Sequence, residues 1–500
     1  MPPPSLSQRA QNRLENDLYT RYTIPSTRKF YDAIHNPDGV INLATAENGL
    51  MCDELLKYMN GHCDLTRNHL KYRASLLKSH TPSLLSALPL YINTYAHPLT
   101  PVTSEQVVIG PGLGSIFAHF VWTVCDEGDG VLLTTPFYDE YERDIIYPSR
   151  AQLVLAHIPA SVDPLSIECI PFIRQTIIDS LENSDGGGNG NGNGTKIKVL
   201  LLCNPHNPLG RAYPEETVLA YAEIAEEFNL HLLVDEAFAN QIFPSSFIPS
   251  PTPFTSILSL DLNGSGKCDP SRMHVDTARV HVLTGPTKTF GASGIKVGAL
   301  VSQANPVLVA MLNAALRATP VSSAADGLMT GVLCGEIEEE LESEDSGNRN
   351  GEGKGKGESE ELGTGLGGFA RWFLEENRRR LSVAFELVGA WCVFHKIDFV
   401  PPSAGVFFLV DFDSIMPKHG PSSDGSGLGM LLSNEERLDN AVAAMLEQGV
   451  FIRPTNTYAD PIPTRFRMTF TLPENEMKLA LRRIDKAFRL PECPGLTLPQ

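Results

Sequence analysis

The sequence predicts an α/β protein with a mostly parallel sheet between helices, joined to a smaller α+β domain. Short apolar runs, typical of strands buried on both faces, alternate with helical periodicity through the first two thirds of the chain. Gly, Pro and Asn follow the ends of these runs, as in successive βαβ units. In the last third, strands and helices mix without this regular alternation, which favours a separate α+β domain.

The elements can be assigned in chain order. Strands of the large domain are expected at 106–109, 130–133, 196–203, 232–234 and 280–283. Helical periodicity is strongest in IFAHFVWTVCDEG and over 215–228. In the last third we expect a helix over 369–388, strands in AGVFFLVDF, GVFIRP and RFRMTFTL, and helices near 434–447 and 474–488.

Composition indicates where the domains end. We expect 1–90 to form an N-terminal arm and part of the small domain. The large domain is predicted over 91–334, with a flexible Gly/Asn insertion at 184–195. Residues 335–368 are acidic and rich in Gly, so a disordered insertion is predicted before the C-terminal small domain at 369–500. A further Gly/Ser loop is expected at 419–429.

Charge and cysteine content exclude several classes of protein. The 500 residues include 40 Lys and Arg against 59 Asp and Glu, a net charge of -19. Nucleic acids and anionic membranes, which attract clustered basic residues, are therefore not expected partners. No apolar stretch is long enough to span a membrane, and the N-terminus lacks the apolar core of a secretory signal. Nine scattered Cys without a CxxC motif predict a cytoplasmic protein with reduced thiols and no metal site.

Ligands of open α/β sheets bind beyond the carboxyl ends of the strands. In this sequence the segments that follow the predicted strands contain residues suited to binding a phosphorylated aldehyde. The segments in question are Gly110 to Ser115, Pro136 to Tyr138, Asn204 to Gly210, Asp235 to Phe238 and Gly285 to Lys288. A Gly-rich turn before a helix can bind phosphate, and an aromatic ring can stack on a heteroaromatic ring. A carboxylate can keep a ring nitrogen protonated, an Asn amide can donate to a ring oxygen, and a Lys can condense with an aldehyde. Together they predict pyridoxal 5'-phosphate (PLP) as the cofactor.

A dinucleotide fold is the rival interpretation of the Gly-rich turn. The pattern Gly110-x-Gly112-x-x-Ser115 lacks the third glycine of GxGxxG, so the PLP interpretation explains the turn better.

The motifs around these residues resemble those of the class I/II aminotransferases of PLP fold type I, most closely the 1-aminocyclopropane-1-carboxylate (ACC) synthase-like branch. The resemblance runs from about Ile41 to the last helix and rests on INLATAENGL, TTPFYDEYERD, CNPHNPLG, VDEAF, GPTKTFGASGIKVG, SAGVFFLVDF and RFRMTFTL, in the family's order. It implies a large domain with a mostly parallel seven-stranded sheet sandwiched by helices, plus a smaller α+β domain. It also implies a homodimer that binds PLP and an amino acid substrate.

The resemblance assigns roles by position. The catalytic residues are Lys288, which forms the Schiff base and moves a proton between substrate Cα and cofactor C4', and Asp235, which pairs with the ring nitrogen. Further cofactor-binding residues are Gly112, Leu113, Gly114, Tyr138, Asn207, Phe238, Thr287 and Lys296. Glu47 and Arg467 are assigned to the substrate, with Arg465 as the alternative arginine. Structural roles stay open beside these, such as a core aromatic for Tyr138 and a helix cap or solvated residue for Glu47.

Four positions depart from the family pattern. Phe238 stands where a Tyr donates to the cofactor 3-oxygen, so Asn207 is left as the main neutral donor. Lys296 stands where an Arg binds phosphate, and a Lys cannot form the planar fork of a guanidinium. Gly285 replaces a phosphate-binding Ser, for which Thr287 is a partial substitute. The Tyr that the partner subunit usually lends falls near 79–80, where no Tyr stands.

The sequence therefore predicts a PLP-dependent enzyme that acts on an α-amino acid through a Schiff base on Lys288, with aminotransfer as the leading reaction. The departures leave two alternatives open. One is elimination or cyclisation, as in ACC synthase or C–S lyases, which needs no amino-accepting second substrate. The other is a non-catalytic protein with the PLP fold.

Overall fold

The computed structural model describes most of the chain. The described residues are 7, 11, 22–63, 65–71, 82–184, 195–262, 273–336, 366–421 and 428–496. The insertions predicted at 184–195 and 335–368 lie almost entirely outside these ranges, and so do residues 79–80.

The chain divides into two compact units. The larger unit comprises Glu47–Val383 and Pro402–Val406, and the smaller unit comprises Met1–Ala46, Ala384–Pro401 and Phe407–Gln500. One passage of the chain from the larger unit to the smaller one, between Val383 and Ala384, falls within the helix α12, which spans Gly368–His395.

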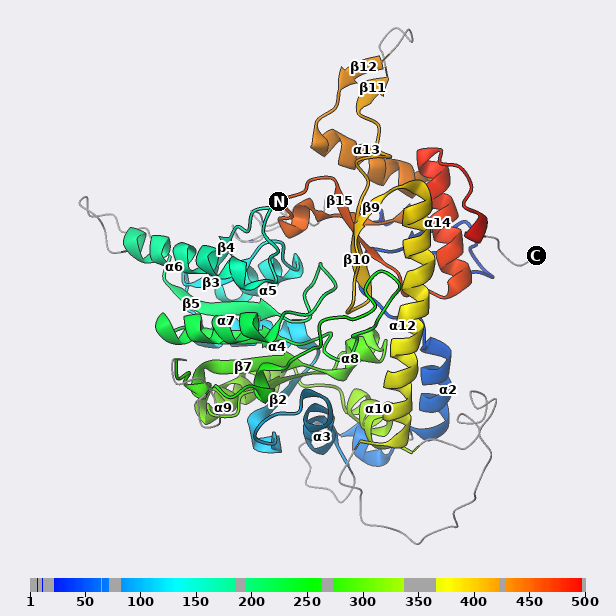
Figure 1. Cartoon of the computed structure of the whole chain (residues 1–500). Helices are drawn as coiled ribbons and strands as arrows, with labels where there is room; N and C mark the ends of the chain where they lie inside the picture. Colours follow the sequence, from blue (N-terminus) through cyan, green and yellow to red (C-terminus); the bar gives the residue numbers. More distant parts are fainter. Residues whose placement is uncertain are drawn as a thin grey trace, which may run out of the picture. The chain divides into compact units, whose positions relative to one another are not determined.

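The larger unit is built on a seven-stranded sheet with the order β2-β8-β7-β6-β5-β3-β4 (Figure 1). The strands are β2 (Val107–Gly110), β3 (Gly130–Thr134), β4 (Gln152–Ala156), β5 (Ile197–Cys203), β6 (His231–Asp235), β7 (Val280–Thr284) and β8 (Gly298–Val301). Neighbouring strands are parallel except that β8 runs antiparallel to both β2 and β7. The predicted mostly parallel, seven-stranded sheet is confirmed.

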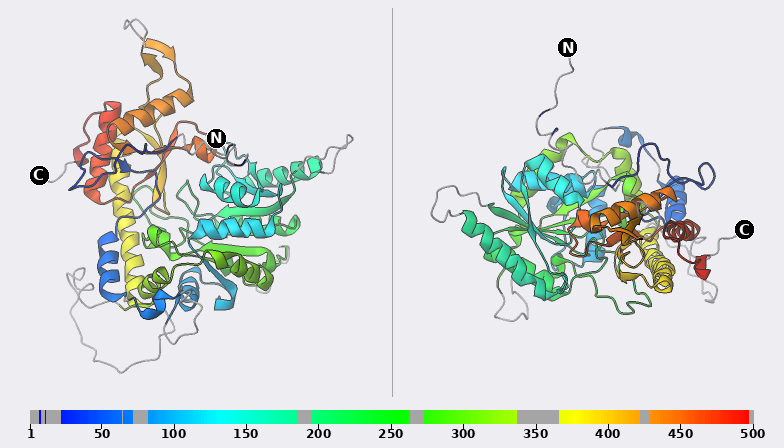
Figure 2. Two further views of the ribbon diagram at one scale, coloured as in Figure 1. Left: turned by 180° about the vertical axis from the view of Figure 1, so that it is seen from behind. Right: turned by 90° about the horizontal axis from the view of Figure 1, so that it is seen from above.

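Helices pack on both sides of this sheet (Figure 2), which explains why its strands are continuous apolar runs. One group consists of α4 (Leu113–Val124), α5 (Glu140–Ser149) and α9 (Pro306–Ala315), in which α4 contacts the other two. A second pair is α6 (Ile170–Ser184) with α7 (Glu215–Glu227). The remaining helices of the unit include α2 (Cys52–His62), α3 (Leu84–Ala96), the short α8 (Pro286–Thr289) and α10 (Ser323–Cys334).

The smaller unit contains an antiparallel sheet with the order β14-β15-β10-β9. Its strands are β9 (Asp398–Val400), β10 (Phe407–Asp411), β14 (Arg453–Pro454) and β15 (Arg465–Thr469), and its helices include α13 (Asn434–Glu447) and α14 (Glu474–Phe488). Both helices have the predicted bounds. A capping box between Ser433 and Glu436 explains why α13 begins where it does.

Two segments of the smaller unit differ from the expectation. GVFIRP forms two short strands instead of one, because β13 (Val450–Phe451) pairs with β1 (Ile41–Asn42) while β14 pairs with β15. The expected loop near 419–429 contains β11 (His419–Pro421) and β12 (Leu428–Leu431), which pair antiparallel. Within the described ranges, no helix has the length and apolar character needed to cross a membrane.

Glycines allow β8 to lie directly against the start of α4. Gly298 is paired with Gly110 of the edge strand. A Cβ atom at Gly298 would lie 2.9 Å from the carbonyl carbon of Gly112 and 2.9 Å from the amide nitrogen of Leu113. A Cβ atom at Gly285 would lie 3.2 Å from the Cα atom of Gly298. Backbone segments from β2, β7 and β8 therefore approach one another at one place in the sheet.

Substituting Gly298→Ala should destabilise the protein by about 1–3 kcal/mol, because rigid backbone atoms surround the new methyl group. Gly61→Ala is the matched control, since Gly61 lies in α2 with nothing within 4 Å of the added Cβ. In a helix that change is expected to stabilise by up to about 1 kcal/mol. Urea unfolding followed by far-UV circular dichroism measures both. Equal free energies of unfolding for the two variants would contradict the steric argument.

Candidate active site

The topology of the sheet places at one edge the carboxyl ends of those strands that are followed by polar residues. The strands β2, β3, β5, β6 and β7 run in one direction, and β8 runs in the opposite direction. The carboxyl ends of the first five strands therefore share an edge with the beginning of β8 (Figure 1). Tyr138, Asn207, Asp235 and Lys288 all stand at or just beyond these ends, as the sequence predicted.

Asp235 is a buried carboxylate at the end of β6, with 8% of its surface exposed. Its Oδ2 atom accepts a hydrogen bond from the Tyr141 hydroxyl at 2.5 Å, and its Oδ1 atom accepts one from the Ala237 amide at 3.0 Å. Burial raises the pKa of Asp235, while the two hydrogen bonds and the positive charge of Lys288 act to lower it. The carboxylate is thus held in an orientation that favours a cationic partner.

Lys288 lies in α8, directly after β7, and its side chain is partly buried. The Nε2 atom of Gln241, a fully buried side chain, donates to the Lys288 carbonyl oxygen at 3.1 Å and fixes this turn. The Lys288 ammonium acts on the pKa of Asp235, so the two charges interact within the larger unit. The arrangement provides an amine and a carboxylate at one edge of the sheet.

The turn after Lys288 packs on the segment that carries Glu47. Gly291 has a φ of +67°, and a Cβ atom there would lie 2.3 Å from the carbonyl oxygen of Asn48. The Asn48 side chain is in turn held by Asn377, whose Oδ1 atom accepts its hydrogen bond at 2.7 Å. Glu47, the neighbour of Asn48, has an exposed side chain.

The Gly-rich turn and Lys296 lie side by side. Gly112 has a φ of +86° and caps α4, which begins with Leu113 and Gly114. A Cβ atom at Gly112 would lie 3.5 Å from the Cδ atom of Lys296, whose side chain is exposed. The backbone amides at the start of α4 and this ammonium group together suit an anion.

The remaining predicted cofactor residues line the same edge. The Thr287 hydroxyl donates to the Val297 carbonyl oxygen at 3.2 Å. The Tyr138 ring is partly exposed and lies edge-on to the Tyr141 ring, with centroids 5.2 Å apart. Asn207 and Phe238 are buried just beyond β5 and β6, with 4% and 5% of their surfaces exposed.

The two candidate arginines of the smaller unit have different surroundings. Arg465 makes an ion pair with Asp460 at 3.6 Å. Arg467 is 3% exposed and donates to the carbonyl oxygen of Ala44. Its guanidinium lies 5.0 Å from the ring centroid of Phe407 and 5.1 Å from that of Tyr458. The substrate role predicted for Arg467 stays a prediction.

Sequence reasoning missed three acidic or phenolic side chains at this edge. Tyr141 donates a hydrogen bond to Asp235. The sequence feature that could have identified it is its position three residues after Tyr138. Asp144, one turn further along α5, has a pKa raised to about 7 by burial and by the charges of Glu140 and Asp235. Glu236 follows Asp235 and is 2% exposed; burial raises its pKa to about 8.

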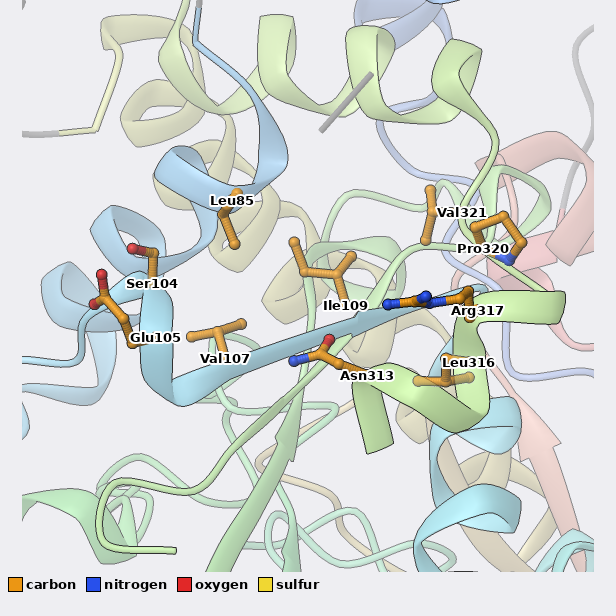
Figure 3. Close-up of a pocket in the computed structure, with 10 residues that line it drawn as sticks. All are labelled: Leu85, Ser104, Glu105, Val107, Ile109, Asn313, Leu316, Arg317, Pro320 and Val321. Atoms are coloured by element: carbon orange, nitrogen blue, oxygen red, sulfur yellow. The ribbon is translucent and has the colours of Figure 1, made fainter. Parts of the chain in front are cut away.

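A separate pocket of about 450 Å³ lies beside the edge strand β2 (Figure 3). It is lined by Leu85, Ser104, Glu105, Val107, Ile109, Asn313, Leu316, Arg317, Pro320 and Val321. None of the predicted site residues lines it, so it is not part of the candidate active site.

Comparisons with known proteins point to one family. The family model described as aminotransferase class I and II matches residues 38–350. The probable aminotransferase gliI of Aspergillus fumigatus is 27% identical over 451 residues, which cover 89% of this chain and 88% of the relative. The 1-aminocyclopropane-1-carboxylate synthase-like protein 1 of Mus musculus is 27% identical over 468 residues, which cover 91% of this chain and 77% of the relative.

Solved structures share the fold. An aspartate aminotransferase from Thermus thermophilus with maleate aligns with a TM-score of 0.60 at 16% identity, covering 97% of this chain and 100% of that one. An N-succinyldiaminopimelate aminotransferase from Mycobacterium tuberculosis aligns with a TM-score of 0.59 at 17% identity, and the alignment covers 90% of this chain and 93% of that one.

Glu236 should make stability depend on pH. Its hydrogen-bond partners are the Ser256 hydroxyl, at 2.9 and 2.8 Å from its two oxygens, and the Ile257 amide at 3.1 Å. The pKa of Glu236 is about 8 in the folded protein and about 4.5 in the unfolded chain, so the unfolded chain loses its proton first as pH rises. The contribution of the uncharged carboxyl group to the free energy of unfolding is therefore fully present below pH 4.5 and is lost as pH rises toward 8. Glu236→Gln, an analogue of the protonated acid, should remove this loss.

The measurement is the free energy of unfolding of wild type and Glu236→Gln between about pH 5 and about pH 9, where the difference should grow by roughly 4 kcal/mol. Glu168→Gln, at an exposed position, is the control. A constant difference across this range would mean that Glu236 is ionised in the folded protein.

Proposed function

Because this chain belongs to the class I and II aminotransferase family, we propose that it binds PLP and acts on an α-amino acid, with aminotransfer as its leading reaction. The observation that carries the proposal is the placement of Asp235, a buried carboxylate, and Lys288 at the carboxyl ends of the adjacent strands β6 and β7. Neighbouring strand ends thus carry an amine that can condense with an aldehyde and an acid that can hold a proton on a ring nitrogen.

The residues present fit this cofactor. The backbone amides at the start of α4, from Gly112 to Gly114, and the ammonium group of Lys296 would bind the phosphate. Asp235 is buried enough to need a cationic partner and already accepts hydrogen bonds at both oxygens. When bound there, PLP would supply the electron-withdrawing ring that stabilises negative charge at the substrate Cα.

Each residue at the edge would have a defined task. Lys288 would hold the cofactor covalently and then move a proton at the substrate Cα. Asp235 would keep the proton on the ring nitrogen, and Asn207 would donate to the 3-oxygen. Tyr138 would stack on the ring face, and the Thr287 hydroxyl would lie near the phosphate.

Recognition of the substrate is assigned to two residues by family position. Arg467 would bind the α-carboxylate with its planar guanidinium, which can form two parallel hydrogen bonds. Glu47 would contact the amine or the side chain of the substrate. We also propose a homodimer, since enzymes of this fold typically complete their active sites with a partner subunit.

Phe238 leaves β- or γ-elimination or cyclisation open as a second candidate function. A phenylalanine cannot donate to the 3-oxygen, so Asn207 would be the main donor and the electronic properties of the cofactor would differ from those of an ordinary aminotransferase. The similarity to a relative named ACC synthase-like points in the same direction.

Binding of PLP is tested by absorbance. Wild-type protein mixed with PLP should develop a visible absorbance band that Lys288→Ala abolishes, because the variant lacks the condensing amine. Lys296→Ala is the comparison variant, which should keep the band but bind PLP roughly tenfold more weakly after losing a charge near the phosphate. Absence of any band with wild-type protein would refute the enzymatic proposal and leave a non-catalytic protein with this fold.

The reaction type is tested by substrate requirement. Single amino acids should give sustained turnover only when a keto acid is added as amino acceptor, since aminotransfer needs two substrates. Products can be followed by mass spectrometry. Sustained turnover of one amino acid alone, with release of a leaving group, would replace aminotransfer by elimination or cyclisation.

A further inference from the structure

The Tyr141 hydroxyl is the closest hydrogen-bond donor to Asp235. Its oxygen lies 2.5 Å from Oδ2, and the Ala237 amide holds the other carboxylate oxygen. With one donor on each oxygen, rotation of the carboxylate is restricted. The remaining acceptor capacity of Asp235 stays available to a cationic donor.

Burial keeps Tyr141 in its protonated, donating form. Only 4% of the residue is exposed. Burial first, and then the negative charge of Asp235, raise the pKa of the phenol well above its ordinary value. Across the pH range in which enzymes work, Tyr141 therefore donates to Asp235 and does not compete with it for a proton.

Packing fixes the Tyr141 ring from two sides. Phe117 of α4 lies 5.3 Å away between ring centroids, at an angle of 57°. Tyr138 lies 5.2 Å away at 84°, an edge-on arrangement. Tyr141 thus connects the helix that begins at the Gly-rich turn with the ring proposed to stack on the cofactor.

We propose that Tyr141 is a positioning residue that orients Asp235 and keeps it ionised for the cofactor ring nitrogen. The inference rests on the proposed function. Without the phenol, the buried carboxylate would more readily take up a proton itself and would lose its hold on the protonated ring. The phenol missing at Phe238 would have acted on the 3-oxygen, whereas Tyr141 acts on the partner of the ring nitrogen.

The test compares Tyr141→Phe with wild type and with Tyr221→Phe. Tyr221 is also fully buried in the larger unit, and its hydroxyl lies 3.4 Å from the Thr134 hydroxyl, so the control loses a buried hydroxyl elsewhere. PLP affinity is measured by absorbance titration from about pH 6 to about pH 8.5. Tyr141→Phe should bind PLP about tenfold more weakly, the effect of losing a hydrogen bond to a charged group.

The pH profile separates positioning from a general loss of structure. Asp235 in Tyr141→Phe would have a higher pKa, so the affinity deficit should widen as pH falls and narrow as pH rises. Tyr221→Phe should keep the wild-type profile. Phe117→Leu, which loosens the ring but keeps the hydroxyl, should give a smaller change of about two- to fivefold in the same direction.

Three outcomes decide the matter. A pH-dependent deficit confined to Tyr141→Phe and Phe117→Leu supports the positioning role. Equal affinity and an equal pH profile for Tyr141→Phe and wild type, with the band still lost in Lys288→Ala, overturn the role and leave the proposed function standing. No PLP band with wild-type protein overturns both.

Discussion

A carboxylate held away from water is the constraint on which the candidate site depends. Asp235 stands at the end of a central strand, and burial opposes its negative charge. The protein offsets that cost with a phenol, a backbone amide and a nearby ammonium group, which come from α5, the turn after β6, and α8. Each of these elements must be in place for Asp235 to keep these contacts, so the position of one buried carboxylate depends on all three elements.

The second constraint is steric and concerns the backbone. The start of α4, the end of β7 and the start of β8 approach so closely that Gly298 leaves no room for a Cβ atom and Gly285 leaves room only for a tight contact. Such an approach exposes helix-start amides at the same edge that carries the carboxylate. The proposed anion site at the start of α4 and the proposed cation partner of Asp235 therefore lie at different strand ends of the same edge.

Much of the architecture was predictable because buried elements need apolar residues at regular positions in the sequence. The apolar runs and helical periodicities identified β5, β6, β7, α7, α13 and α14, since these elements pack against a core. Strand β8 was missed because Gly298 to Val301 is a short run inside a motif of small residues. Pairing partners also escaped prediction: the split of β13 from β14 depends on β1, which lies about 400 residues earlier.

Site residues could be predicted where the chemistry requires a particular residue type. They could not be predicted where the role of a residue depends on which side chains lie near it in the folded protein. Lys288 and Asp235 follow strands in recognisable motifs. Tyr141 looked like one more aromatic residue, because only the fold reveals which carboxylate its hydroxyl meets. The surroundings of Arg465 and Arg467 likewise depend on Asp460 and Ala44, which no sequence pattern connects to these arginines.

Cys203 illustrates chemoselectivity at this edge. It is paired with Asp235 in the sheet, and its thiol points to the Pro205 carbonyl oxygen at 3.5 Å. Aldehydes are attacked by thiolates as well as by amines, so a reactive thiol here would compete with Lys288 for an aldehyde. Burial raises the pKa of Cys203 to about 12, and the thiol stays protonated. The protonated thiol of Cys203, beside Asp235 in the sheet, is therefore a poor nucleophile for any aldehyde that enters this edge.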